Sequence, residues 1–569
     1  MSVVTESAEL RSALRQCRMS FLVGFWFHAF TEVTALAYPI FMVQAFDRVV
    51  PARSYATLIA LLTGVAVVLL FKGVFTYLRT KLLVLASLRL DRLLSARVFG
   101  AFLDRSAAQH DQTGAEALRD LTHFRQFFAG SGAITAMSAP WGALFIGVLF
   151  AISPVIGATA LALSAIQVAV MIANMRMTKS AIGSASAARN ATYRYAEANL
   201  RSADAVLAMG MAPGLTKAWL RRNDAAISAE AHGSTVGAGF SAFEGSFSVL
   251  QSVALLSVAV VEIIRSDLQG GIAFAAVIVF GFAQRPLTQV VHSWGSYLQA
   301  REAGARLARL LEASPPPRPA MPLPKPRGEI LCRGVVYFPR GAEHPVLRGL
   351  GLHVEAGTSL GLVGPIGSGK STLVRMIVGL IRPTSGEIRL DGAETWAWNR
   401  DDLGRHIGYL PQEIGLVSGT VAENIGRFGL FDERDIVAAA ERAGAHSTIL
   451  RLPRGYDTPI GEGGHPLSGG QRQLVGLARA VVGEPSLVVL DEPNSNLDGP
   501  GEVALLECIK QLKTIGATLI MVSHRPNLVA GLDRIALLRD GMIQLAVPAD
   551  EFMERSGRTI SIRPKSSEG

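Results

Sequence analysis

The sequence predicts a chain in two parts: an all-α membrane domain of six helices, followed by an α/β domain built around a phosphate-binding loop. The first observation is that 49% of the 569 residues are hydrophobic and only 18% are charged, and that residues 126–175 contain no Asp, Glu, Lys or Arg. A membrane-spanning helix needs about 20 apolar residues. The second observation is a glycine-rich loop at residues 364–371. This composition excludes an intrinsically disordered chain, which would need low hydrophobicity and high charge.

A proline-rich segment separates the two parts. Seven of the twelve residues from Pro315 to Pro326 are proline, and proline favours an extended, semi-rigid spacer. We therefore predict a membrane domain at residues 1–312, a linker at 313–327, an α/β domain at 328–555 and a polar tail at 556–569. The alternative role for the linker is that of a ligand for a proline-recognition domain.

Apolar segments of the first part predict six membrane spans, at residues 20–46, 54–77, 134–152, 155–175, 241–264 and 268–284. The uncharged stretch divides at Pro154, because a proline suits the first turn of a new helix. Three acids fall within the spans: Glu32, Glu244 and Glu262. Charges inside a bilayer are costly and often mark a transport pathway. The alternatives differ: Glu262 lies near a span end and would reach water, Glu244 lies near the inner end of its span, and Glu32 would pair with His28, four residues before it.

Basic residues are concentrated in two long segments of the first part. Residues 79–125 contain eight Lys and Arg, and residues 176–222 contain another eight. Positively charged loops stay on the cytoplasmic side, so both termini and the α/β domain are predicted to face the cytosol. These loops explain the net charge of +9 and the pI of about 9.6 without a nucleic-acid partner, the other class of partner that a basic chain suggests. Three distant cysteines argue against a disulfide scaffold: Cys17, Cys332 and Cys508.

The glycine-rich loop matches the pattern G-x-x-x-x-G-K-[ST]. It lies between a strand-like run at residues 359–363 and a helical run at 372–380, which is the context that this motif requires. Backbone N–H groups and the helix N-terminus can then hold phosphate oxygens. Lys370 can neutralise the β- and γ-phosphates, and Ser371 can bind Mg²⁺. The predicted phosphate-binding residues are Gly364, Pro365, Ile366, Gly367, Ser368, Gly369, Lys370, Ser371 and Thr372.

A second strand-like run, at residues 487–490, ends in the acids Asp491 and Glu492. Two carboxylates at the end of a buried strand cost free energy unless they serve a function. Near a phosphate loop, we expect Asp491 to bind Mg²⁺ and Glu492 to orient or deprotonate the water that attacks ATP. The sequence therefore predicts an ATPase whose cofactors are ATP and Mg²⁺.

The segment LSGGQ precedes a helical run at residues 472–482. A helix N-terminus at this point could bind an anion, and a plain helix cap is the alternative. LSGGQ is similar to the signature of the ABC transporters, and it lies shortly before the Asp-Glu strand, as in that family. The resemblance implies that the signature binds ATP through Ser468, Gly469, Gly470 and Gln471.

Further motifs resemble the same family. The resemblance implies that Gln412 acts in hydrolysis and contacts the metal together with the phosphate-loop serine, that His524 is the switch histidine and that Asp498 belongs to the nucleotide-binding D-loop. Tyr337 or Phe338 takes the position of the aromatic residue that stacks on adenine, with ordinary core packing as the alternative.

The resemblance to ABC proteins covers nearly all of residues 328–548. It implies the fold class, a membrane all-α six-helix exporter domain followed by an α/β P-loop ABC nucleotide-binding domain. The chain has one phosphate loop, one signature and six predicted spans. This is half of what the family needs, so the resemblance implies a homodimer that holds two ATP molecules between its nucleotide-binding domains.

Five segments resemble the type I secretion proteins that export proteases and repeat-in-toxin proteins. They are residues 41–51, 117–120, 139–141, 460–464 and 491–498. The resemblance implies an ATP-driven exporter in a bacterial inner membrane that moves an unfolded protein with a C-terminal signal. It also implies a periplasmic adaptor and an outer-membrane channel as partners, and no nucleic acid. The alternatives are export of a lipid, polysaccharide or small amphiphile, and a regulatory ABC protein that does not pump.

Overall fold

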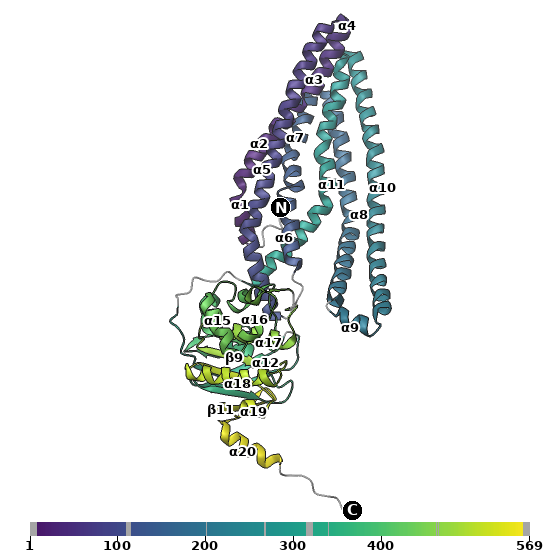
Figure 1. Ribbon diagram of the computed structural model, residues 1–569. Coiled ribbons are helices and arrows are strands. Elements are labelled where there is room, and N and C mark those ends of the chain that lie inside the picture. Colours follow the sequence, from purple (N-terminus) through teal and green to yellow (C-terminus); the bar gives the residue numbers. More distant parts are fainter. Residues whose placement is uncertain are drawn as a thin grey trace, which may run out of the picture. The chain divides into compact units, whose positions relative to one another are not determined.

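The computed structural model describes residues 8–109, 115–200, 202–266, 269–314, 323–339, 341–461, 464 and 466–560. The chain divides into two compact units, Met1–Pro316 and Pro317–Gly569 (Figure 1). Much of the predicted linker, residues 315–322, and most of the predicted tail, residues 561–569, lie outside the described residues.

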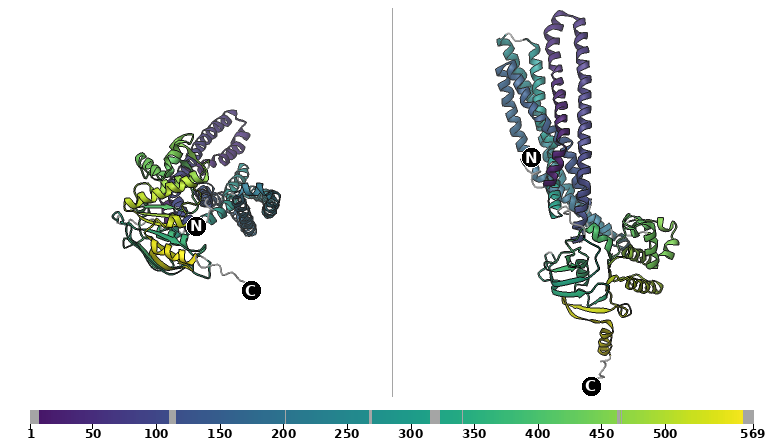
Figure 2. Two further views of the ribbon diagram at one scale, coloured as in Figure 1. Left: turned by 60° about the horizontal axis from the view of Figure 1, so that its bottom comes forward. Right: turned by 90° about the vertical axis from the view of Figure 1, so that its left-hand side faces the viewer.

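The first unit is built from helices. Within the described ranges, six helical stretches are long and apolar enough to cross a membrane, as the sequence predicts. α8 and α10 pack along one another, and α11 packs against α6, α7 and α8; Figure 2 shows the long helices of this unit from two further directions. The helices are α1 (Ala8–Gln16), α2 (Arg18–Ala35), α3 (Ala37–Gln44), α4 (Val50–Ala52), α5 (Tyr55–Gln109), α6 (Ala115–Phe128), α7 (Ser131–Ile152), α8 (Pro154–Leu200), α9 (Ala203–Ala208), α10 (Ala212–Ser266) and α11 (Gly271–Ala313).

The first predicted span is not one continuous helix. α2 ends at Ala35, α3 begins at Ala37, and a π-helical turn, η2 (Ala45–Val49), leads into α4. Pro39 explains the first break, because its nitrogen has no hydrogen to donate to the carbonyl of Ala35 and its ring crowds the preceding turn.

The other predicted spans lie inside longer helices. α5 has 55 residues and contains the predicted span at residues 54–77, in agreement with the expectation that the basic segments are long enough to extend the membrane helices beyond the bilayer. At 1.5 Å per residue α5 extends about 80 Å, far beyond the thickness of a bilayer. The predicted division at Pro154 is confirmed, since α8 begins there. The predicted start of the sixth span, Leu268, lies outside the described residues, and α11 begins at Gly271.

Each of the three acids predicted within the spans has a polar neighbour. Glu32 Oε1 lies 3.7 Å from His28 Nε2, Glu244 Oε1 accepts a hydrogen bond of 3.2 Å from Gln167, and Glu262 Oε1 accepts one of 3.1 Å from Ser266. The contact of Glu32 with His28 agrees with the pairing predicted for that acid. A place for these acids along a transport pathway stays a prediction.

The second unit contains two main sheets. One sheet has the strand order β12-β11-β3-β10-β9-β6, and the other has the order β2-β1-β4-β5. The strands are β1 (Ile330–Tyr337), β2 (Leu347–Val354), β3 (Ser359–Val363), β4 (Ser385–Leu390), β5 (Ala393–Glu394), β6 (Ile407–Leu410), β7 (Gly419–Thr420), β8 (Pro459–Ile460), β9 (Leu487–Asp491), β10 (Thr518–Val522), β11 (Arg534–Arg539) and β12 (Met542–Pro548). The helices are α12 (Lys370–Ile377), α13 (Arg400–His406), α14 (Val421–Ile425), α15 (Glu433–Arg442), α16 (His446–Leu450), α17 (Gly469–Val481), α18 (Gly499–Thr514), α19 (Pro526–Val529) and α20 (Ala549–Ile560).

The central strands of the six-stranded sheet run parallel, and one edge of this sheet carries the chemistry. β3, β10, β9 and β6 are consecutive parallel neighbours, so their carboxyl ends meet at the same edge. Every residue of β9 and β10 is buried. All of them except Asp491 and Thr518 are apolar, as expected for strands that are covered on both faces. The loops that leave this edge carry the predicted site residues, and ligands of open α/β sheets bind at such an edge.

Candidate nucleotide-binding site

The phosphate loop connects β3 to α12 and depends on glycine. Gly364, Gly367 and Gly369 have positive φ angles of 155°, 80° and 101°. A Cβ atom on Gly364 would lie 2.0 Å from the Leu538 carbonyl oxygen, and one on Gly369 would lie 2.8 Å from Leu347 Cδ2. No other residue fits these two positions, because both the backbone conformation and the space exclude a side chain. Ile366, at the tip of the loop, is 95% exposed.

Lys370 and the loop backbone hold one another. The Lys370 ammonium donates hydrogen bonds of 2.9 Å to the carbonyl oxygens of Gly364 and Pro365. Burial lowers the pKa of Lys370, while the carboxylates of Glu492 and Asp491 act in the opposite direction. The ammonium therefore lies between the loop and the two acids, where it can neutralise phosphate oxygens. Thr372 follows in the first turn of α12.

Asp491 ends β9 and is almost fully buried, with 2% of its surface exposed. Burial raises the pKa of Asp491, although a hydrogen bond from Ser371 lowers it. Its Oδ1 atom and the Ser368 hydroxyl are buried without a hydrogen-bond partner among the residues that the structure describes. A free carboxylate oxygen beside a serine hydroxyl fits Mg²⁺, which prefers oxygen ligands. A free hydroxyl in the loop fits a phosphate oxygen.

The three predicted catalytic side chains meet at the ends of three neighbouring strands. Gln412 follows β6, Glu492 follows β9 and His524 follows β10. Gln412 Nε2 donates a hydrogen bond of 3.2 Å to Glu492 Oε2, and His524 Nε2 lies 3.6 Å from Glu492 Oε1. Glu492 itself has a φ of 51° and donates its N–H to the Val522 carbonyl at 3.0 Å. The strand order thus gathers residues that are far apart in sequence around one carboxylate.

The signature residues begin a helix. The Ser468 hydroxyl accepts the N–H of Gln471 at 3.3 Å, and Gln471 Oε1 accepts the N–H of Ser468 at 2.9 Å. The helix-cap alternative is therefore confirmed as a local role of this segment. Gly469 and Gly470 lie against Asn496: a Cβ on Gly470 would be 3.2 Å from its carbonyl oxygen.

Asp498 and Gln473 make hydrogen bonds to the backbone near the signature and the end of β9. Asp498, predicted as part of the D-loop, caps α18 by accepting the N–H of Gly501 at 2.9 Å. Sequence reasoning missed Gln473, which is 1% exposed on α17. Its amide donates to the Pro493 carbonyl at 2.6 Å and accepts from Asn496 Nδ2 at 3.3 Å. The only signal in the sequence is a polar residue on the buried face of a helix.

The two adjacent aromatic residues have different surroundings. Tyr337 ends β1 and packs against the apolar core of the unit. Phe338 is 41% exposed, and its backbone N–H donates to Thr384 Oγ1 at 3.0 Å. The exposure of Phe338 favours it for stacking on a base, and the packing of Tyr337 fits the core-packing alternative; which of the two contacts adenine stays a prediction.

Comparison with known proteins places both units. Residues 21–287 match the ABC transporter transmembrane region, and residues 347–495 match the ABC transporter family. The type I secretion system ATP-binding protein PrsD of Rhizobium meliloti (strain 1021) is 37% identical over 96% of this chain and 94% of its own length. The cyclolysin secretion/processing ATP-binding protein CyaB of Bordetella pertussis is 28% identical over 90% of this chain and 73% of its own length.

The fold of the whole chain is similar to a solved exporter. A bacterial Atm1-family ABC exporter with ATP bound superposes with a TM-score of 0.79, over 98% of this chain and 99% of that one. Its sequence identity of 20% shows a shared fold. The family is shown by PrsD, which matches this chain over nearly its whole length. Together, the phosphate loop, the signature, the membrane helices and this relative show that the chain belongs to the ABC transporter ATPases of type I secretion systems.

Proposed function

We propose that this ATPase is the inner-membrane exporter of a type I secretion system, and that it moves an unfolded protein with a C-terminal signal out of a bacterial cell. The observation that carries the proposal is the intact cluster of Gln412, Glu492 and His524 beside a complete phosphate loop, in a chain that is a relative of type I secretion proteins. A regulatory protein that does not pump would not need this cluster. We also propose the domain limits 1–312 and 328–555, with the linker between them.

The residues of the candidate nucleotide-binding site can perform ATP hydrolysis. Lys370 and the N–H groups of the loop would hold the β- and γ-phosphates. Ser371, Asp491 and Gln412 would hold Mg²⁺, which supplies charge neutralisation at the phosphates. Glu492 would accept a proton from the attacking water, and His524 would steady the same carboxylate. The orphan Oδ1 of Asp491 supports the place of the metal.

The signature supports action as a homodimer. Ser468, Gly469, Gly470 and Gln471 form a helix N-terminus, a site that favours anions. Because this chain contains one phosphate loop and one signature, we propose that a second copy supplies the signature to each ATP. The further partners in this proposal are a periplasmic adaptor, an outer-membrane channel and the secreted protein.

The test compares proteins secreted by host cells that carry the wild type, Lys370→Ala or Lys510→Ala at matched abundance of the chain. Lys510 is a suitable control because its side chain is 74% exposed on α18. We expect Lys370→Ala to abolish export of one or a few intact proteins and Lys510→Ala to preserve it. An unchanged set of extracellular proteins in Lys370→Ala cells contradicts the proposal and favours a lipid, polysaccharide or small amphiphile as cargo.

A further inference from the structure

Arg427 lies in the connection between α14 and α15, in an unusual backbone conformation. Arg427 and Phe428 have φ angles of 51° and 55°. The left-handed region is unfavourable for residues with a Cβ atom, and it persists only where the surroundings enforce it. Two consecutive residues of this kind indicate that the position of the Arg427 side chain is under strong constraint.

The Arg427 guanidinium hydrogen-bonds to the ends of two helices. It donates to the carbonyl oxygens of Arg479, at 2.8 and 3.0 Å, and of Ala480, at 3.4 Å, in the last turn of α17. It also donates to the carbonyl oxygens of Gly404 and Ile407, the latter at 3.0 Å, at the end of α13. The last carbonyls of a helix lack partners within the helix and carry partial negative charge, so a buried cation is stabilised there.

The charge of Arg427 is retained at neutral pH. Burial, and to a lesser extent the neighbouring Arg479, together lower the pKa of Arg427 to about 10. Because about 10 is still well above neutral pH, the guanidinium stays protonated with all its donors. It also lies over the ring of Phe431, with 5.2 Å between the guanidinium carbon and the ring centre.

The two helices that Arg427 bridges are adjacent in sequence to two parts of the proposed ATP site, Gln412 and the signature. α13 runs directly into β6, and β6 is followed by Gln412. α17 begins with the signature, which Ser468 caps. A second contact joins the same elements, because Arg479 Nη1 donates to the Gly415 carbonyl, three residues after Gln412, at 3.0 Å.

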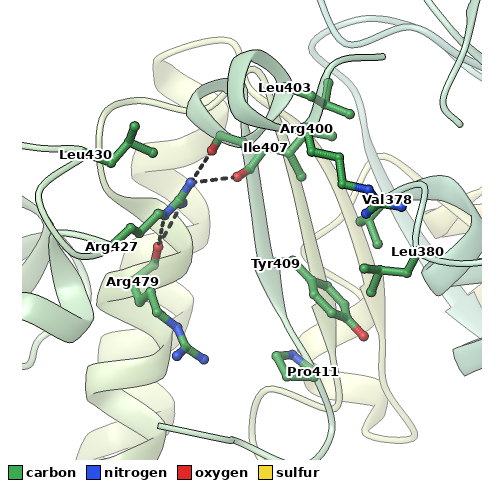
Figure 3. A pocket seen from close by; sticks show the side chains of 11 residues that line it. Val378, Leu380, Arg400, Leu403, Ile407, Tyr409, Pro411, Arg427, Leu430 and Arg479 are labelled. Carbon is green, nitrogen blue, oxygen red and sulfur yellow. Dashed lines mark hydrogen bonds between the residues drawn. The ribbon is translucent and has the colours of Figure 1, made fainter. Parts of the chain in front are cut away.

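A cavity lies beside the Arg427 guanidinium. Figure 3 shows Arg427 and Arg479 on one side of a cavity and Arg400, Val378 and Leu380 on the other. The cavity has a volume of about 400 Å³. Beside this cavity, Arg427 joins the ends of α17 and α13 by hydrogen bonds, in addition to the direct packing of α17 on β6.

We infer that Arg427 is a positioning residue that makes the signature helix and the Gln412 strand move as one body during the ATP cycle. This inference rests on the proposed function. When Gln412 responds to the γ-phosphate, the shift of β6 is passed through the guanidinium to α17 and so to the signature. Without this link, the packing of α17 on β6 and the hydrogen bond from Arg479 to Gly415 still hold the two elements, but more loosely. The site would then still bind ATP but would reach the arrangement that hydrolyses it less often.

Arg442 provides a matched control, because it contacts the same end of α17 without reaching α13. Its Nη1 donates to the Val481 carbonyl at 3.1 Å, and its guanidinium lies 3.7 Å from the Glu484 carboxylate. Arg427→Lys and Arg442→Lys both keep the positive charge. Both remove the planar guanidinium with its several N–H donors, because lysine carries a single compact ammonium group. Only Arg427→Lys breaks the connection between the two helices.

The experiment uses the full-length exporter and measures ATP turnover and the affinity for a fluorescent ATP analogue. For Arg427→Lys we expect kcat to fall about tenfold, typical of a coupling free energy between sites, with unchanged affinity for the analogue. For Arg442→Lys we expect kcat within about twofold of wild type. A merely structural role predicts that both variants lose thermal stability and kcat together, and that outcome overturns the inference. So does an Arg427→Lys variant with wild-type kcat.

A second measurement applies even if Arg427→Lys fails to fold. Hydrogen exchange is followed in Glu492→Gln protein on addition of ATP. We expect the amides of residues 404–415 and 469–481 to change protection together; a change in one segment alone overturns the inference. Loss of wild-type ATP turnover, or full turnover in Glu492→Gln, would instead be a failure of the proposed function, so the two failures are distinguishable.

Discussion

The side-chain amide of Gln412 donates a hydrogen bond of 3.2 Å to the Glu492 carboxylate. His524 lies 3.6 Å from the other oxygen of the same carboxylate. One carboxylate is thus oriented by side chains that follow both neighbouring strands. Such preorganisation suits a general base, because its geometry does not have to be built during the reaction.

Glu492→Gln should keep ATP binding and lose turnover. Glutamine has the same shape and can still contact Gln412, but it cannot accept a proton from water. We expect kcat to fall at least about 100-fold, the usual contribution of a general base, with little change in the affinity for ATP. Turnover and equilibrium binding are measured on the same purified exporter. Glu507→Gln, at a side chain that is 57% exposed, is the control and should be neutral; near-normal turnover in Glu492→Gln would sink the assignment.

Asp491→Asn should stabilise the nucleotide-free protein while abolishing hydrolysis. Burial raises the pKa of Asp491, so the folded state binds its proton more tightly than the unfolded state. The stability due to that proton is present at low pH and lost as pH rises through the folded pKa. At neutral pH, the neutral asparagine avoids a buried charge, and we expect the melting temperature of the full chain to rise by a few degrees. The gain should shrink as pH falls through the folded pKa and vanish below the unfolded pKa.

Asp533→Asn is the control of opposite sign. Burial acts to raise the pKa of Asp533, but hydrogen bonds from Lys513 and Ser359 lower it overall. Its ionised form therefore stabilises the fold above the unfolded pKa, and this contribution is lost as pH falls through the folded pKa. We expect Asp533→Asn to lower the melting temperature at neutral pH. If the melting temperatures of Asp491→Asn and Asp533→Asn shift in the same direction, the predicted opposite pKa shifts of the two carboxyl groups are contradicted.

Local motifs in the sequence were good predictors where the chemistry is local. The strand at residues 359–363 is present as β3, and the phosphate loop follows it, because glycines and an apolar run specify this turn within a few residues. The helix after the signature begins at Gly469, three residues before the predicted start. Two glycines disfavour a helix by propensity, but the capping box of Ser468 and Gln471 outweighs them.

Long-range features could not be predicted in the same way. The second span is expected to extend beyond Tyr77, but the sequence does not give the end of that extension. α5 continues to Gln109, and neighbouring helices cover Leu90 and Leu94 in this part of it. The role of Arg427 depends on carbonyl groups 20 to 53 residues away. Backbone acceptors carry no sequence signal, so only the folded arrangement shows why an arginine stands there.

Phe338→Ala should weaken ATP binding more than Tyr337→Leu. Phe338 is 41% exposed, whereas Tyr337 packs on the core. Loss of stacking on a base costs about 1–3 kcal/mol, so we expect the Kd for ATP to rise at least about fivefold in Phe338→Ala. Tyr337→Leu keeps apolar packing and should leave the Kd within about twofold. Titration of both variants with ATP decides between them, and the reverse order would show that Tyr337 is the adenine contact.

The distinctive segment at residues 41–51 has a structural role that can be tested through Gly271. Asp47, in the π-helical turn η2, accepts the first N–H of α11 at Gly271 over 2.7 Å. Phe46 stacks on Phe274 beside this cap, with ring centres 4.6 Å apart. A Cβ on Gly271 would lie 2.9 Å from the backbone of Val43 and 2.8 Å from the Asp47 carboxylate. The two helices can therefore meet at this point only through glycine.

Gly271→Ala should separate α3 from α11, break the cap and reduce export without affecting ATP binding. A lost cap costs about 1 kcal/mol, and the contact with backbone atoms adds to it because neither helix can yield without moving as a whole. Gly270→Ala is the matched control, since its φ is −61° and a Cβ there has no neighbour within 4 Å. Secreted protein, ATP affinity and melting temperature are measured for both variants. Equal export by Gly271→Ala and Gly270→Ala would show that the Asp47 cap is dispensable for transport.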